Sequence, residues 1–166
     1  PRDQIPIIES QPEIAIGEDG KPMAAGELYV IVSLKKSGTG EAGNVIVRGV
    51  GPASIKLRRT VKIIQGRMFT EGLPEVIVGK STAQRFAGAE LGGSVKFARQ
   101  SWRVVGIFEA DRSGFESEAW GDINQMMAGF NRPVFSSMTL KLSDPNKFQE
   151  LKKRLENDPR LSVDVK

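Results

Sequence analysis

The sequence predicts an α+β fold in which one lobe is interrupted by a smaller inserted lobe. Strand-length apolar segments outnumber helical ones, and 18 glycines and nine prolines among 166 residues provide frequent turns. A β/α unit near the start and another near the end flank a middle segment of different pattern. We therefore expect a first, discontinuous lobe over residues 1–66 and 132–166 and an inserted lobe over 67–131.

The composition is typical of a folded, water-exposed domain. Hydrophobic residues make up 39% and charged residues 27% of the chain. The formal charge of +4 comes from scattered basic residues, which favours no nucleic-acid partner. No segment approaches the roughly 20 apolar residues that a membrane helix needs. The chain begins at Pro1 with no signal-peptide pattern, so we expect a segment cut from a longer protein.

The first third predicts the order β-β-α-β after a short opening helix. The second strand follows the first after a glycine-rich loop and is expected to be its antiparallel partner. Pro52 stands in the first turn of the next helix, where its missing N–H is harmless. In chain order we expect a helix over 3–9, strands over 27–35 and 44–50, a helix over 52–58 and a strand over 61–65.

The middle segment predicts a strand, a helix and a hairpin. Ser81 is placed to cap the helix, and Gln100 and Ser101 can form the turn of the hairpin. In chain order we expect a strand over 75–78, a helix over 82–87, hairpin strands over 94–99 and 102–109, a surface loop over 111–122 and a helix over 123–130.

The last third predicts a β-α-β unit. Asp144 is placed to cap a helix whose first residue is Pro145. Phe148, Leu151 and Leu155 follow at helical spacing along one face. This helix connects expected strands over 134–142 and 161–165. The crossings between the two lobes, near 66–71 and 131–134, are the expected hinges.

The residue types argue against an enzyme. The chain has no cysteine and no histidine, which excludes thiol catalysis, Cys/His zinc sites and Ser-His-Asp arrangements. Gly79–Thr82 has the Gly-Lys-Ser-Thr order of a phosphate-binding loop. However, Pro74 occupies the place of the required upstream glycine and offers no N–H. We interpret this segment as a helix start and expect no cofactor and no metal.

Acidic residues are the remaining material for metal binding or acid-base chemistry. They gather in the expected surface loop, but their spacing does not match a calcium loop. A solvated loop is the favoured interpretation. A hydrolase that uses only carboxylates stays open, because the separation of two carboxylates depends on the fold. The residues concerned are Glu109, Asp111, Glu116, Glu118 and Asp122.

The same region also carries aromatic and methionine side chains among its charges. Such residues are enriched at protein contact surfaces, although they also pack in cores. Both interpretations stay open from the sequence. The candidate partner-interaction surface consists of Phe115, Glu116, Glu118, Trp120, Asp122, Met126 and Met127.

Four short motifs, taken in their order, resemble the MacB-like periplasmic core domain of FtsX/MacB-type ABC transporter permeases. No single motif is specific, but the order of all four is. The resemblance covers about half of the chain, from Asn44 to about Asp122. The motifs are GRMF at 66–69, VGKSTA at 78–83, LGGSV at 91–95 and VVGIF at 104–108.

The resemblance implies a porter-like α/β lobe with a smaller inserted α+β lobe and no catalytic residue. It implies a domain on the periplasmic side of the bacterial inner membrane, with one membrane helix before this segment and three after it. The implied partners are a cytoplasmic ATPase subunit or domain reached through those helices, a second permease copy, and a periplasmic protein or substrate. The implied function is mechanotransmission, in which ATP hydrolysis rearranges the outer domain.

A free-standing soluble periplasmic binding or adaptor module is the alternative. The gene around this segment distinguishes the two hypotheses, because a permease requires membrane-length apolar stretches on both sides.

Overall fold

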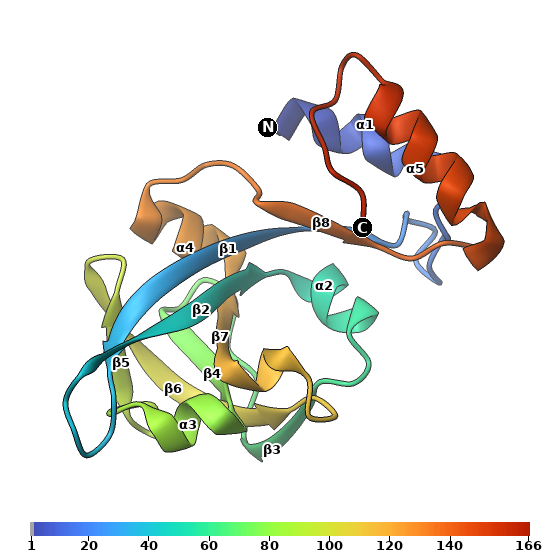
Figure 1. Ribbon diagram of the computed structural model, residues 1–166. Coiled ribbons are helices and arrows are strands. Elements are labelled where there is room, and N and C mark those ends of the chain that lie inside the picture. The colour runs from blue at the N-terminus through green and yellow to red at the C-terminus, as the bar shows by residue number, and fades with distance from the viewer. Residues whose placement is uncertain (1) are drawn as a thin grey trace.

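The computed structural model describes residues 2–166 and centres on one mixed, eight-stranded sheet (Figure 1). Seven strands follow the order β3-β6-β4-β7-β2-β1-β8, and β5 pairs with β6 off this path. The strands are β1 (Ala24–Lys35), β2 (Ala42–Val50), β3 (Lys62–Gly66), β4 (Glu75–Gly79), β5 (Ser94–Phe97), β6 (Gln100–Glu109), β7 (Glu118–Asp122) and β8 (Ser137–Leu140).

Short helices connect these strands. The α-helices are α1 (Ile5–Glu9), α2 (Pro52–Leu57), α3 (Lys80–Arg85), α4 (Ile123–Phe130) and α5 (Phe148–Asn157). Three 3-10 helices complete the set: η1 (Arg2–Gln4), η2 (Gly114–Ser117) and η3 (Pro145–Lys147). Among residues 2–166, no helix combines the length and the apolar character that crossing a membrane requires.

The α+β fold class is confirmed, and so are most of its elements. β1 and β2 form the expected antiparallel pair, in register from Leu28 opposite Gly49 to Lys35 opposite Ala42. β5 and β6 form the expected hairpin. Its turn lies two residues earlier than predicted, at Ala98 and Arg99, whose φ angles of 51° and 61° are left-handed.

The predicted surface loop over 111–122 is wrong in its second half. Residues 118–122 form β7, a buried strand that lies parallel to β2 and antiparallel to β4. The sequence EAWGD reads as a loop because it is polar and lacks β-branched residues. In the fold its carboxylates meet buried donors, which makes a polar strand compatible with the interior.

The predicted closing strand over 161–165 is also wrong. Residues 161–166 have no regular structure, although their apolar and polar residues alternate in exposure. The tail is held by α5 instead. Lys152 Nζ donates to the Val165 carbonyl at 2.6 Å, and the Val165 N–H donates to Glu156 Oε1 at 3.1 Å. The expected β-α-β unit is therefore left without its second strand.

The cap predicted at Ser81 is wrong. α3 begins at Lys80, two residues before the predicted start at 82, and its N-cap is Gly79, which offers no side-chain hydrogen bond. The predicted cap at Asp144 is confirmed, since its carboxylate accepts from the Asn146 N–H at 3.0 Å. A 3-10 turn then precedes α5, so the α-helix proper begins at Phe148.

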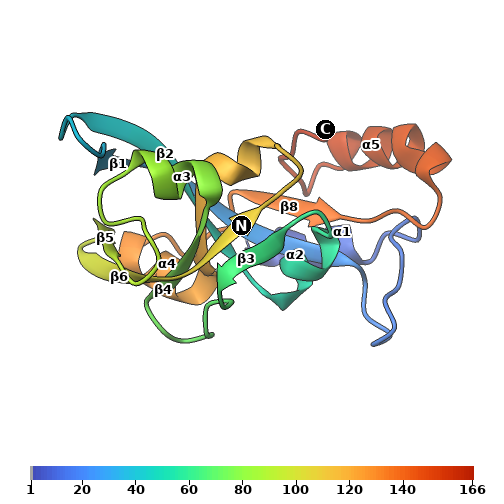
Figure 2. The same ribbon diagram turned by 90° about the horizontal axis from the view of Figure 1, so that it is seen from below.

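Apolar packing divides the molecule into a large body and a smaller terminal lobe. Two clusters fill the body, one around Trp102 and one around Trp120. A third cluster joins α1, β8, α5 and the tail, through Ile8, Leu151 and Leu155. We call residues 2–24 and 137–166 the terminal lobe. Figures 1 and 2 place its helix α5 at one end of the molecule and α3 at the other.

The apolar clusters divide the chain at other positions than the predicted lobe boundaries. β3, assigned to the lobe 1–66, pairs with β6, assigned to the insertion 67–131. The expected crossing at 131–134 does lie between the body and the terminal lobe, after α4 and before β8. The crossing at 66–71 lies within the body, where Phe69 is part of the core. That the predicted lobes behave as separate units stays a prediction.

Candidate functional site

A group of four charged side chains, three of them buried and one half-buried, lies where the body meets the terminal lobe. We call Glu27, Arg48, Arg58 and Glu118 the junction cluster. Glu27 lies on β1, Arg48 on β2 and Glu118 on β7, and Arg58 directly follows α2. The sheet topology therefore brings together residues that are far apart in the sequence, with 91 positions from Glu27 to Glu118. The cluster has two positive and two negative charges and is formally neutral.

Arg48 is the centre of the junction cluster. Its Nε and Nη2 atoms donate to the two carboxylate oxygens of Glu118, each at 2.8 Å, and its Nη1 donates to Glu27 at 2.8 Å. Such a bidentate pairing has the strongest and most directional geometry available to a carboxylate. Burial opposes the charge of Arg48, but the hydrogen bonds and charges of Glu118 and Glu27 outweigh it and raise the pKa of the guanidinium.

Arg58 extends the cluster to the terminal lobe. It donates to both oxygens of Glu27, at 2.8 and 3.0 Å, and to the hydroxyl of Thr139 on β8 at 3.1 Å. Glu27 is fully buried, so these donors satisfy a carboxylate that has no access to water. The network thus connects α2, the centre of the sheet and β8 through one carboxylate.

Aromatic rings enclose the guanidinium groups. The ring of Phe115 lies 5.4 Å from Arg48 Cζ and 4.6 Å from Arg58 Cζ. Trp120 packs edge-on against Phe115 and donates its indole N–H to Glu118 at 2.7 Å. These contacts hold the planes of both guanidinium groups against the aromatic rings.

The structure places three of the seven predicted surface residues in this cluster or against it: Phe115, Glu118 and Trp120. It buries six of the seven, all except Phe115. These six side chains point into the body, and that the seven residues form a partner-interaction surface stays a prediction. The interpretation as core packing, left open by the sequence, describes Trp120, Met126 and Met127.

The other two carboxylates among those seven residues hold backbone segments. Glu116 Oε1 accepts from the N–H groups of Ala110 and Arg112, at 3.0 and 2.9 Å. These hydrogen bonds, with the charge of Lys80, lower the pKa of Glu116. Asp122 caps α4 through the Asn124 N–H at 3.0 Å and accepts the Gly72 N–H at 2.7 Å. The solvated-loop interpretation is wrong for both carboxylates.

Sequence reasoning missed Glu27, Arg48, Arg58 and Thr139. Arg48 gave a usable signal, because it interrupts the otherwise apolar run NVIVRGV within a strand. A charge inside a strand buried on both faces requires a partner of opposite sign. Which residue supplies that partner depends on β7 lying beside β2, and the sequence showed no strand there.

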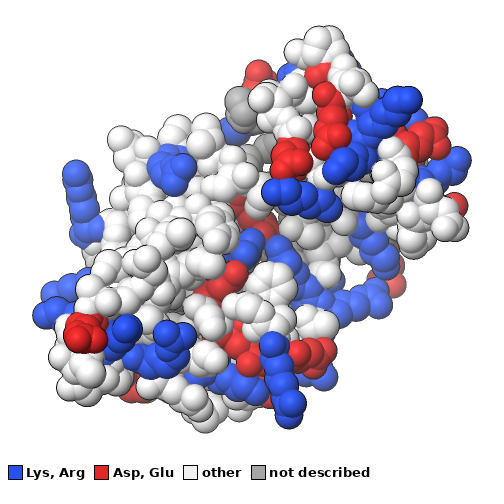
Figure 3. All heavy atoms as spheres, in the orientation of Figure 1, with Lys and Arg blue, Asp and Glu red and all other residues white. Residues whose placement is uncertain are grey.

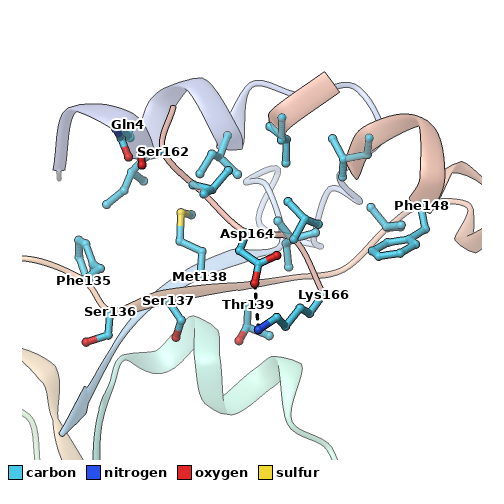
Figure 4. Close-up of a pocket in the computed structure, with 18 residues that line it drawn as sticks. Gln4, Phe135, Ser136, Ser137, Met138, Thr139, Phe148, Ser162, Asp164 and Lys166 are labelled. Atoms are coloured by element: carbon cyan, nitrogen blue, oxygen red, sulfur yellow. Dashed lines mark ion pairs between the residues drawn. The ribbon is translucent and has the colours of Figure 1, made fainter. Parts of the chain in front are cut away.

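A hollow of about 590 Å³ lies within the terminal lobe, between β8, α1, α5 and the tail (Figure 4). Its walls are mostly apolar, with Met138 and Phe148 among the residues that line it. Its charged lining residues are Asp164 and Lys166, which pair with each other at 2.9 Å. The hollow therefore offers apolar volume and no free charge.

The junction cluster has the properties of a structural connection. Both oxygens of each carboxylate accept hydrogen bonds from arginine side chains, so neither carboxylate presents a free oxygen to a substrate. Within residues 2–166, no group of three or more acidic side chains is arranged to hold a metal ion. The arrangement can hold α2 and β8 in fixed positions relative to β1, because Arg58 bonds to both Glu27 and Thr139.

Comparisons with known proteins agree with this fold. The sequence pattern of the MacB-like periplasmic core domain matches residues 7–158. The extracellular domain of the ABC-type transporter YknZ from Gram-positive bacteria is similar in structure, with a TM-score of 0.66 and 14% identity over 90% of this chain and 76% of that one. The periplasmic region of MacB from Actinobacillus actinomycetemcomitans gives 0.62 and 17%, over 93% and 72%. No curated protein matches in sequence.

Proposed function

Because the chain belongs to the family of MacB-like periplasmic core domains of ABC transporter permeases, we propose that it couples ATP hydrolysis in the cytoplasm to events outside the inner membrane. ATP turnover on a separate subunit or domain would change the arrangement of its two lobes. The new arrangement would bind or release a substrate or a partner protein. The domain itself performs no chemistry in this proposal.

One observation carries the proposal: the two lobes have separate apolar cores. The core of the terminal lobe includes Ile8, Leu151 and Leu155, and the larger core of the body includes Leu28. β1 passes from one to the other, and the junction cluster bridges them through Thr139. Two lobes with separate cores, joined by the short β1/β8 ladder and the junction cluster, are an arrangement in which a hinged motion can occur.

The position of the chain ends supports the same proposal. The first and last described segments both lie in the terminal lobe, where the Gln4 side chain donates to the Arg160 carbonyl at 3.3 Å (Figure 1). A force applied through either end of the chain would therefore reach the terminal lobe first. The body would respond through β1 and the junction cluster. The membrane-embedded permease, a second permease copy and the ATPase are the partners that the proposal requires.

Distance measurements between two spin labels would test the coupling. The chain has no cysteine, so Lys96→Cys on β5 and Lys153→Cys on α5 place one label on each lobe. Both positions are exposed. The full-length permease and its ATPase in lipid vesicles would be measured without nucleotide, with ATP, and with ATP and vanadate. We expect the distance distribution between the labels to change between these states.

A label pair within the body, Lys62→Cys with Lys96→Cys, is the matched control and should keep one distribution throughout. If ATP is hydrolysed while the distribution between the lobes stays fixed, the proposed rearrangement does not occur. If both label pairs shift equally, the body deforms as well, and the hinge lies elsewhere than between these two lobes.

A further inference from the structure

A second hollow, on the α2 side of the junction cluster, differs from the apolar hollow of the terminal lobe in its charge. It has a volume of about 460 Å³ and lies between α2 with the turn that follows it and residues 139–141 of the terminal lobe. We call this hollow the α2 groove. Its lining includes four basic side chains and no acidic one: Lys56, Arg58, Arg59 and Lys141.

Three of these four cations are free to meet a ligand. Arg58 is bound to Glu27 beneath the groove. Lys56, Arg59 and Lys141 are exposed, and none makes an ion pair with an acidic residue in the described chain. They come from both walls of the groove, two from the α2 side and one from the terminal lobe. Figure 3 shows basic side chains gathered over this part of the molecule.

The lining between the charges is partly apolar. Leu57, Leu140 and the half-buried ring of Phe115 contribute to it. Phe115 is held in place, because its ring is stacked against Arg58 and packs edge-on against Trp120. A fixed aromatic ring among cations gives an apolar anchor site beside electrostatic attraction, and peptide-binding grooves combine these two features.

We propose that the α2 groove binds an acidic peptide segment of a partner protein, with an apolar side chain of that segment against Phe115 and its carboxylates toward Lys56, Arg59 and Lys141. A small inorganic anion fits less well, because the least exposed of the four cations, the half-buried Arg58, already has a carboxylate partner. A flat membrane surface also fits less well, because part of the lining lies in a hollow. An extended chain can enter that hollow and place several carboxylates along it.

The groove has one wall on each lobe, so its shape depends on how the lobes are arranged. A bound segment would contact α2 on the body and residues 139–141 on the terminal lobe together. A ligand that binds one arrangement better than another shifts the equilibrium toward it. Only this shift between lobe arrangements rests on the proposed function. Binding itself can be measured on the isolated 166-residue chain.

Fluorescence anisotropy with defined peptides tests the proposal. The probe is a labelled ten-residue peptide of alternating glutamate and leucine with one central phenylalanine, and its matched partner has glutamine at every glutamate. The groove variant combines Lys56→Gln, Arg59→Gln and Lys141→Gln. The control variant combines Lys96→Gln, Arg103→Gln and Arg132→Gln, which removes three exposed charges that lie outside the groove.

We expect the acidic peptide to bind the unchanged chain and the glutamine peptide to bind at least about tenfold more weakly. The groove variant should lose about tenfold or more in affinity for the acidic peptide, and the control variant less than about twofold. Circular dichroism of both variants confirms that they are folded.

Three results would overturn the proposal. The first is the absence of acidic-peptide binding to the unchanged chain at low salt. The second is an equal loss in the two variants, which would mean attraction by net charge alone. The third is groove-dependent binding to phosphatidylglycerol vesicles that exceeds binding of the peptide, which would assign the groove to a membrane surface. None of these results depends on the label distances that test the coupling, so each proposal can fail alone.

Discussion

At the scale of single residues, the molecule depends on charges that are buried in balanced pairs. Glu27 is fully buried, and Glu118 and Arg48 are nearly so. A buried ion pair adds little net stability compared with an apolar pair, because both ions lose their hydration. Removal of one partner is costly, because the other is left buried and unpaired. The value of the junction cluster is therefore in fixing the register of β1, β2 and β7.

Arg48→Met should show this asymmetry. The change leaves Glu118 with the indole N–H of Trp120 as its side-chain donor, and we expect the free energy of unfolding to fall by about 3–5 kcal/mol. The double variant Arg48→Met/Glu118→Gln should be less destabilised than the sum of the two single changes, because no unpaired carboxylate remains at position 118. Urea unfolding followed by tryptophan fluorescence measures all three variants. Strict additivity would show that the two side chains are not energetically coupled.

Glu116 should make stability depend on pH. Backbone N–H groups of Ala110 and Arg112 hold its pKa below the ordinary value in the folded state. Its contribution is therefore fully present above the ordinary glutamate pKa of about 4.3 and is lost as pH falls through the lower folded value. Glu116→Gln should destabilise the protein at pH 7, and the difference from the unchanged chain should shrink below about pH 4. Urea midpoints from pH 7 to pH 3 check this, and a constant difference would contradict it.

At the scale of elements, the sequence identified those with a strong local signal. The β1/β2 pair combines β-branched residues with a glycine-rich turn, and α2 begins at a proline, so local chemistry alone defines them. β7 has no such signal. Its five residues form a strand because β2 and β4 offer hydrogen bonds on both sides. The junction cluster could not be predicted for the same reason, since Glu118 reaches Arg48 through that strand.

Ser81, the predicted cap of α3, and Asp122, the observed cap of α4, allow a matched test of whether a side chain caps each helix. Asp122→Ala removes the cap of α4 and the acceptor of the Gly72 N–H, and should cost about 1–2 kcal/mol of unfolding free energy. Ser81→Ala should change it by less than about 0.5 kcal/mol, because α3 begins at Lys80 without a side-chain cap. Thermal and urea unfolding of the two variants decide this, and an equal cost for both would mean that Ser81 has a structural role.

At the scale of the whole molecule, the separation into body and terminal lobe determines which part of the protein unfolds first when a contact is weakened. The terminal lobe packs on its own small core and meets the body through β1 and Thr139. Opening of such a small unit costs less free energy than unfolding of the body, so it can occur alone. Any change that weakens the polar bridge between the lobes should therefore appear in the terminal lobe first.

Arg58→Met weakens that bridge, because it leaves the 3.4 Å hydrogen bond from the Thr139 hydroxyl to Glu27 as the direct side-chain contact with β8, while Glu27 keeps Arg48 as its partner. Hydrogen bonds to charged groups contribute about 1.5–3 kcal/mol, so we expect amide hydrogen exchange in β8 and α5 to accelerate about tenfold or more. Exchange in β4 and β6, at the centre of the body, should change much less. Mass spectrometry of peptides from the two regions measures both, and Arg103→Met, which removes an exposed arginine of β6, is the control. Unchanged exchange in α5, or an equal increase across the body, would show that the two lobes open as one unit, and a hinge between them would then require another connection than Arg58.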